Sequence, residues 1–331
     1  MITPDAGRVA LDSVLLFVGL VLLLGAAYYL VQSSVTISLT LGISRVVIGA
    51  TAVAFGTSAP EFLVSLVSGL RDVPGVALGN ILGSNVANVG LVIGIAALVR
   101  PMRVHARLVR WEIPILGIAT VAILGFGLAG MIERWEGLVM FAGLVAFIVL
   151  SPLLFRESAE ETAQEVSEAG RLVPRTFRGL APQVLILAGS VGALALGAQL
   201  AVDGATGLAA TLGVSDFVIG VTVIAVGTSL PELATSMVAA WRNEHDIAVA
   251  NIVGSNIFNL LGVIGLTAGI VPLAVDPALY SFEMIALTVS TLVLMPLVWP
   301  TPYISRKEGA LLLVGYIAFT VLVVVRGGVA T

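Results

Sequence analysis

The chain contains one internal repeat, which recurs at a fixed offset of 171 residues. Residues 42–98 align with residues 213–269 without a gap, and 26 of the 57 aligned positions are identical. Chance does not produce that agreement, so the fold must contain two copies of one structural unit. Two polar motifs stand out in both copies: Gly-Thr-Ser-x-Pro-Glu at 56–61 and 227–232, and Gly-Ser-Asn at 83–85 and 254–256.

Long apolar runs indicate which solvent surrounds the two copies. Hydrophobic residues make up 58% of the 331 residues and charged residues 11%, a mix far from that of soluble domains. The mean hydropathy is +1.09. Ten runs are long enough to cross a bilayer as helices: 11–32, 43–70, 76–99, 112–130, 137–155, 182–202, 214–241, 247–271, 282–299 and 308–326. We therefore predict an all-α polytopic membrane protein with about ten transmembrane helices.

The two copies are predicted to have opposite orientations in the membrane. Each copy contains five spans, and an odd number of spans returns the chain on the far side. The predicted domains are a first five-helix repeat at 1–155, a cytoplasmic acidic and basic linker at 156–181, and a second, inverted repeat at 182–331. Inverted repeats that meet at the bilayer midplane are common in secondary transporters, so this architecture favours an alternating-access carrier.

Basic residues divide unevenly between the two sides of the membrane. When the loops are numbered in order, 12 of the 16 lysines and arginines fall on one side. The other four are Arg8, Arg71, Arg134 and Arg326. Because cytoplasmic loops carry the excess of Lys and Arg, both termini are predicted to be extracellular or periplasmic. We expect a multi-pass protein of the cell membrane.

Two glutamates, Glu61 and Glu232, lie near the centre of spans that contain almost no other charge. An ionised carboxylate at that depth costs about 3 kcal/mol or more unless it is paired or bound to an ion. Each glutamate follows a proline, Pro60 or Pro231, which cannot donate to the carbonyl four residues earlier and therefore kinks the helix. Kinking also strains the neighbouring turn, so backbone carbonyls there are candidates to point at a ligand.

Oxygen-bearing residues follow the same helical faces as the glutamates. Spacing of three and four residues aligns the first motif of each copy into stripes made by Ala54, Thr57, Ser58, Ala225, Thr228 and Ser229. The next span of each copy adds a ridge at i, i+4 and i+8 made by Asn80, Ser84, Asn88, Asn251, Ser255 and Asn259. With two carboxylates and no thiol or histidine, this set predicts an all-oxygen cage for a hard cation. Calcium fits better than magnesium, because calcium accepts six to eight ligands in irregular geometry.

Structural roles compete with this interpretation. Gly, Pro, Ser and Thr in membrane helices often make kinks or tight helix contacts. Intramembrane glutamates at equivalent positions of both copies favour an ion site instead. Two further acids, Glu112 and Glu283, lie near span ends, and we expect both to extend toward the membrane interface.

At these residues the chain resembles the cation/calcium exchanger superfamily, and specifically its prokaryotic sodium/calcium exchanger branch. The resemblance covers both repeats. It implies that Glu61 and Glu232, with the carbonyls of Thr57 and Thr228, bind calcium centrally. It further implies that sodium shares the two glutamates, so that the two ions compete. The implied sodium ligands are Ala54, Thr57, Ser58, Glu61, Ser84, Ala225, Thr228, Ser229, Glu232 and Ser255. The supporting polar residues are Asn80, Asn88, Asn251 and Asn259.

The predicted function is sodium/calcium exchange by alternating access. A calcium/proton antiporter is the alternative, although that branch of the superfamily usually shows a different sequence around its glutamates. A cation channel could also use paired carboxylates and freed carbonyls, but it does not require inverted halves. An acid at the position of Asn259 accompanies potassium co-transport in one branch, so this neutral residue argues against potassium dependence.

Other classes of protein fit the sequence poorly. No nucleotide-binding glycine-rich loop or metalloprotease motif occurs, so we expect no enzymatic activity. We expect no cofactor, since Ca²⁺ and Na⁺ are the transported ions. The predicted partners are the lipid bilayer and these two ions, with no nucleic acid and no obligate protein partner.

Overall fold

The computed structural model describes residues 6–154, 179–214, 219, 223, 225–299 and 302–329. The predicted linker, 156–181, lies outside these residues except for its last three. Almost all of the described chain is helical, and its strands are only two residues long each. The predicted all-α architecture is therefore confirmed.

In the first half, one long helix precedes a series of segmented ones. The elements are α1 (Ala6–Leu41), α2 (Arg45–Ile48), η1 (Gly49–Val53), α3 (Ala54–Thr57), α4 (Ala59–Leu70), α5 (Pro74–Ala87), η2 (Asn88–Val92), α6 (Ile93–Val99), β1 (Met102–Arg103), η3 (Leu108–Glu112), α7 (Ile113–Gly127), β2 (Met131–Ile132) and α8 (Arg134–Leu154). The elements labelled η are π-helical turns, which often occur at functional sites. Ser44 caps α2, because its hydroxyl accepts a hydrogen bond from the Val47 amide.

The second half follows the same plan. Its elements are α10 (Leu180–Thr211), α12 (Ala225–Thr228), α13 (Leu230–Trp241), α14 (His245–Ile257), η6 (Phe258–Ile264), α15 (Gly265–Ile270), β3 (Leu273–Ala274), α16 (Pro277–Val298), β4 (Tyr303–Ile304) and α17 (Arg306–Val329). A π-helical segment again divides the helix that carries the Gly-Ser-Asn motif. The sequence repeat is thus also a repeat of elements.

Two pairs of turn residues repeat the backbone conformation as well. Gly42 and Gly213 follow α1 and α10 with φ angles of +65° and +78°. Asp72 and Asn243 follow α4 and α13 with φ angles of +58° and +66°. Glycine, Asn and Asp are the residues that adopt this left-handed conformation most readily. Both pairs are separated by 171 residues, so the copies end these helices by the same device.

Apolar helices of spanning length account for most of the described chain. Seven helical segments are long and apolar enough to cross a membrane, and the pair Arg45–Thr57 and Ala59–Leu70, bent by 49°, adds an eighth. Phe282–Val298 is apolar but shorter. Each of the ten predicted runs overlaps a helix, while the number of complete spans stays a prediction. The 49° bend falls at Ser58, two residues before Pro60, as the missing proline N–H predicts.

Burial separates central helices from peripheral ones. The most apolar stretch of His245–Ile270 is entirely buried, and that of Pro74–Val99 is 78% buried. In contrast, only 11% of the corresponding stretch of Arg306–Arg326 is buried. Large apolar side chains on the outside, such as Ile118 and Leu185, are 70% and 73% exposed. Such a surface suits a bilayer and would promote association in water.

The two halves exchange contacts across the molecule. Helix α17 packs on α6, and α8 packs on α15. Strand β1 pairs with β4 and β2 with β3, both antiparallel, so each short sheet also joins one half to the other. A Cβ on Gly137 would come within 2.6 Å of the Gly265 carbonyl oxygen, and one on Gly94 would come within 3.0 Å of the Gly309 oxygen. These glycines therefore permit the close approach between halves.

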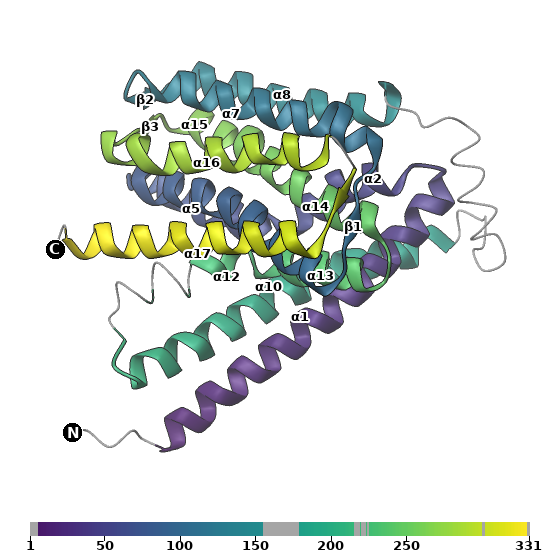
Figure 1. Ribbon diagram of the computed structural model, residues 1–331, viewed down its shortest axis with the longest axis horizontal. Helices are drawn as coiled ribbons and strands as arrows, with labels where there is room; N and C mark the ends of the chain where they lie inside the picture. The colour runs from purple at the N-terminus through teal and green to yellow at the C-terminus, as the bar shows by residue number, and fades with distance from the viewer. Residues whose placement is uncertain are drawn as a thin grey trace.

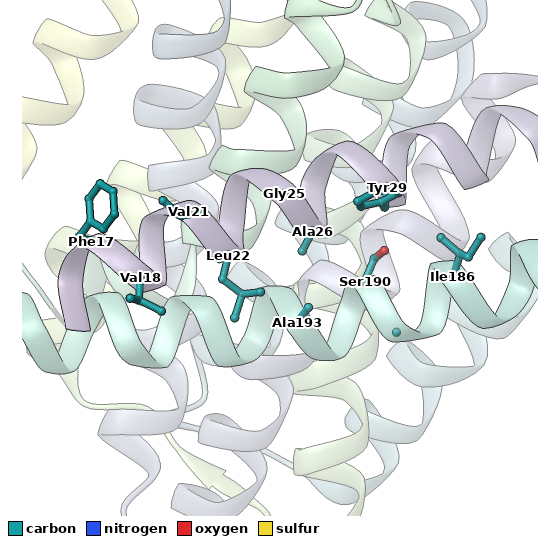
Figure 2. Close-up of a pocket in the computed structure, with 11 residues that line it drawn as sticks. Phe17, Val18, Val21, Leu22, Gly25, Ala26, Tyr29, Ile186, Ser190 and Ala193 are labelled. Atoms are coloured by element: carbon teal, nitrogen blue, oxygen red, sulfur yellow. The ribbon is translucent and has the colours of Figure 1, made fainter. Parts of the chain in front are cut away.

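Helices α1 and α10 lie side by side along one edge of the molecule (Figure 1). Gly19, Gly197 and Gly204 allow their backbones to touch, because an added Cβ would collide with the facing helix. Between them lies an open cavity of about 670 Å³, shown in Figure 2. Its lining is almost wholly apolar and includes Phe17 and Leu22, and no glutamate contributes to it. This groove offers hydrocarbon contact, not ion ligands.

Candidate functional site

Both glutamates of the repeated motif lie at helix breaks in the centre of the molecule. Glu61 is in the first turn of α4 and Glu232 in the first turn of α13, and each side chain is 0% exposed. A helix N-terminus carries partial positive charge from its free N–H groups, so an acidic side chain is favoured there. That effect is far smaller than a full counter-charge. The two carboxylates therefore need a cation to be stable in ionised form.

The surroundings of the two carboxylates differ. Ser58 Oγ donates a hydrogen bond of 3.0 Å to Glu232 Oε1, which links the first half to the second. The described residues provide no hydrogen-bond partner for Glu232 Oε2 or for either Glu61 oxygen. The Glu232 carboxylate and the Thr228 hydroxyl both lie close enough to the Glu61 carboxylate to interact with it electrostatically. No salt bridge joins either glutamate to a basic side chain within the described ranges.

Hydroxyl groups of the two motifs interlock between the halves. Thr57 Oγ1 donates to Asn251 Oδ1 at 3.1 Å and shares a hydrogen bond of 3.3 Å with Ser255 Oγ. In the mirror position, Ser84 Oγ and Thr228 Oγ1 share a hydrogen bond of 3.4 Å. The helix break of one half thus faces the Gly-Ser-Asn helix of the other. The oxygen-bearing faces predicted for the two halves therefore lie against each other in one cluster.

Asn80 and Asn251 donate hydrogen bonds to α4 and α13, the helices that begin just after the two breaks. Asn80 Nδ2 donates to the Glu61 backbone oxygen at 3.2 Å and to Ser65 Oγ at 2.9 Å. Asn251 Nδ2 donates to Ser236 Oγ at 3.1 Å. The sequence interpretation overlooked Ser65 and Ser236. Their identity across the 171-residue offset was the available signal.

Asn88 is the first residue of η2 and Asn259 is the second residue of η6, and both lie next to this cluster. Asn88 Nδ2 donates to Asn256 Oδ1 at 3.0 Å, and Asn259 Nδ2 donates to Asn85 Oδ1 at 2.9 Å. The side-chain oxygens of these two residues, Asn88 Oδ1 and Asn259 Oδ1, are buried and have no hydrogen-bond partner among the described residues. Both are therefore available to a cation or to water.

The remaining predicted ligands are less engaged. Ala54 is fully buried on α3, and Ala225 is the first residue of α12, its side chain lying outside the described part. Ser229 is buried, and its hydroxyl has no partner within the described chain. Among the fourteen predicted site residues, direct hydrogen bonds between the halves join seven to one another: Thr57, Ser58, Ser84, Thr228, Glu232, Asn251 and Ser255. Asn88 and Asn259 also bond across the halves, to Asn256 and Asn85.

The expectation for Glu112 was wrong. Its side chain does not extend toward the interface but is 0% exposed, and Arg107 Nε donates to its Oε1 at 2.8 Å. Arg107 Nη2 also donates to Ser151 Oγ on α8 at 2.6 Å. A basic partner five residues earlier lets this acid be buried as an ion pair. Glu283, its counterpart in the second half, is half-buried on α16.

The chemistry of the central cluster is that of oxygen donors alone. Within the described ranges, no three His, Cys, Asp or Glu side chains gather closely enough to hold a metal ion. Two carboxylates therefore supply the charge, and hydroxyl, amide and backbone oxygens supply the other contacts. A charge of −2 balances one divalent cation or two monovalent ones. Such a site suits Ca²⁺ and Na⁺ better than a transition metal.

Comparison with known proteins gives the family. The sodium/calcium exchanger protein family matches residues 12–152 and 182–325, which together include both copies of the repeat. The chain belongs to the sodium/calcium exchanger family. Its members are transporters of the membrane, in agreement with the apolar helices.

Individual exchangers align over nearly their full length. The putative antiporter CaxA of Alkalimonas amylolytica is 36% identical over 94% of this chain and 98% of its own. The sodium/calcium exchanger MaX1 of Methanosarcina acetivorans is 32% identical over 95% of this chain and 99% of its own. A structure of the sodium-calcium exchanger NCX_Mj, soaked without Na⁺ and Ca²⁺, superposes with a TM-score of 0.79. It is 30% identical, covering 93% of this chain and 97% of that one.

Proposed function

We propose that this exchanger moves Ca²⁺ across the membrane in exchange for Na⁺. The observation that carries the proposal is the pair of fully buried glutamates, one from each half, with no basic partner in the described chain. A buried charge without a protein counter-charge requires a cation from outside the protein. The oxygen donors around the pair suit hard cations, and the relatives MaX1 and NCX_Mj are named as sodium/calcium exchangers.

In this proposal, calcium binds between Glu61 and Glu232, with the carbonyls of Thr57 and Thr228 as further ligands. Both threonines lie at the end of a short helix that breaks just before the glutamate. Sodium uses adjacent sites built from Ala54, Ser58, Ser84, Ala225, Ser229 and Ser255 together with the same threonines and glutamates. Because both ions need the two carboxylates, they displace each other, which is what couples their movements.

Alternating access follows from two inverted five-helix repeats with ten spans in total. The repeated turns and the contacts exchanged between halves support this arrangement. Swapping the conformations of the two halves would turn a site open to one side into a site open to the other. In this proposal, the first repeat comprises residues 1–155 and the second comprises residues 182–331. The linker between them lies in the cytoplasm, and both termini are extracellular or periplasmic.

Topology can be tested on the native background, which contains no cysteine. Arg71 is exposed in a turn predicted to face outward, and Arg103 is exposed in strand β1, in a connection predicted to face the cytoplasm. In intact cells, an impermeant thiol reagent should label Arg71→Cys and spare Arg103→Cys. The reverse pattern would overturn the orientation.

Ion coupling can be tested by ⁴⁵Ca²⁺ uptake into proteoliposomes. Sodium-loaded vesicles diluted into sodium-free buffer should accumulate the isotope, and vesicles without a sodium gradient should not. Uptake driven by a proton gradient alone would replace the proposal with calcium/proton antiport, for which the bare description of CaxA as an antiporter leaves room. Uptake without any counter-ion gradient, driven by voltage, would indicate a channel.

A further inference from the structure

Four buried asparagines are connected by hydrogen bonds where the helices that carry the two Gly-Ser-Asn motifs pack against each other. Asn85 and Asn256 each donate to the other's backbone carbonyl, both at 3.3 Å. Asn259 donates to the Asn85 side-chain oxygen at 2.9 Å, and Asn88 donates to the Asn256 side-chain oxygen at 3.0 Å. The exposed fraction of all four side chains is 1% or less. Each bond joins one half of the exchanger to the other.

The order of donors and acceptors in this set is determined by the backbone. A carbonyl oxygen can only accept, so the amide group that faces it must present NH₂. Asn85 therefore turns its NH₂ toward the Asn256 carbonyl and its oxygen toward Asn259. Asn259 must then offer NH₂ to that oxygen, which leaves its own oxygen turned away. The same sequence of steps runs from the Asn85 carbonyl through Asn256 to Asn88.

The two side-chain oxygens at the ends of these chains have no hydrogen-bond partner in the part of the chain that the structure describes. Asn88 Oδ1 and Asn259 Oδ1 are buried and accept no hydrogen bond from the described residues. Each asparagine lies one helical turn beyond a serine of the candidate site: Ser84, which contacts Thr228, and Ser255, which contacts Thr57. Buried acceptors left open in a well-bonded network indicate a ligand that is not part of the protein.

We propose that Asn85 and Asn256 are positioning residues for ion binding, which hold Asn259 and Asn88 with their amide oxygens toward the cation. This inference rests on the proposed function. A hard cation requires oxygen ligands, and an amide rotated by half a turn would present NH₂ instead. Each half of the exchanger thereby orients the ligand of the other half. A substitution at Asn85 should act on the cation through Asn259, and one at Asn256 should act through Asn88.

A double-mutant cycle on Ca²⁺ affinity separates this role from simple packing. Equilibrium ⁴⁵Ca²⁺ binding is measured on purified protein in sodium-free detergent solution for Asn85→Ala, Asn259→Ala and the double variant. Each single substitution should weaken binding by about tenfold, and the double variant should lose no more than about tenfold, because both changes remove the same ligand. Asn85→Ala combined with Asn88→Ala is the control, and there the two losses should multiply.

The positioning role would be overturned if the losses of Ca²⁺ affinity in Asn85→Ala and Asn259→Ala multiplied in the double variant. Unchanged Ca²⁺ affinity in Asn85→Ala would overturn it as well. A packing role would lower the melting temperature of Asn85→Ala without a selective link to Asn259. The mirror cycle of Asn256→Ala with Asn88→Ala provides an independent reading if Asn85→Ala fails to fold. Wild-type protein that binds no Ca²⁺ would instead overturn the proposed function, so the two failures are distinguishable.

Discussion

Two groups of buried carboxylates in this exchanger have opposite surroundings. Glu112 is paired with Arg107, and Arg107 also donates hydrogen bonds to Ser151. Glu61 and Glu232 are equally buried, but their described neighbours are hydroxyl and amide groups and each other. All three acids come from apolar spans of similar composition. Burial alone therefore does not identify an ion site.

The difference lies in the source of the neutralising charge. For Glu112 the charge is part of the protein, so the ion pair needs no ion from outside, and its hydrogen bonds to Ser151 connect η3 with α8. For Glu61 and Glu232, in the proposed function, the neutralising charge is supplied by the transported cation. A site that depends on a visiting cation can bind and release ions, whereas a self-neutralised pair cannot.

Glu61→Gln and Glu232→Gln should have the largest effect on transport. Glutamine keeps the shape but removes the charge, so Ca²⁺ affinity and exchange should fall by about a hundredfold or more, as for other buried charge pairs. Both variants should stay folded, with an ion-free melting temperature equal to or above that of the wild type, since a costly buried charge is gone. Isotope uptake and thermal unfolding in detergent measure the two effects. Normal Ca²⁺ affinity in either variant would remove the central site from this account.

Glu112→Gln should show the opposite pattern. Removing one partner leaves the Arg107 charge buried and uncompensated, which should cost about 3 kcal/mol of stability and lower the melting temperature. The folded protein should retain most of its exchange activity. Arg107→Met combined with Glu112→Leu is the matched control, and it should recover much of the lost stability because no charge remains. Loss of exchange in a folded Glu112→Gln protein would erase the contrast.

Potassium should have the smallest effect. Asn88 and Asn259 are neutral, so within the described residues the candidate site offers a co-transported monovalent ion no negative charge beyond that of the two glutamates. Sodium-driven Ca²⁺ uptake should be the same when external and internal K⁺ are replaced by choline. An obligatory requirement for K⁺ would show that the charge inventory of the site is incomplete.

The sequence predicted which residues gather at the candidate site better than which of them are hydrogen-bonded to one another. Residue types and the 171-residue offset sufficed to select Glu61, Glu232 and their hydroxyl neighbours, because buried charge in an apolar span has few alternatives. Helical spacing describes one helix at a time, so it could not indicate that Thr57 meets Ser255 across the halves. It also placed Glu112 at the interface, because a span end in sequence says nothing about the helix packed over it. Asn85 belonged to a recognised motif, yet its role depends on a backbone carbonyl that no sequence pattern identifies.

Competition between the two ions tests the central claim most directly, because exchange requires both to use Glu61 and Glu232. Equilibrium ⁴⁵Ca²⁺ binding to the purified exchanger is titrated with Na⁺, and choline maintains the ionic strength. If both ions use the two carboxylates, Na⁺ should raise the apparent Kd for Ca²⁺ progressively while the maximal amount of bound Ca²⁺ stays constant. Simultaneous binding, with Ca²⁺ affinity unchanged at saturating Na⁺, would contradict a shared pair of carboxylates.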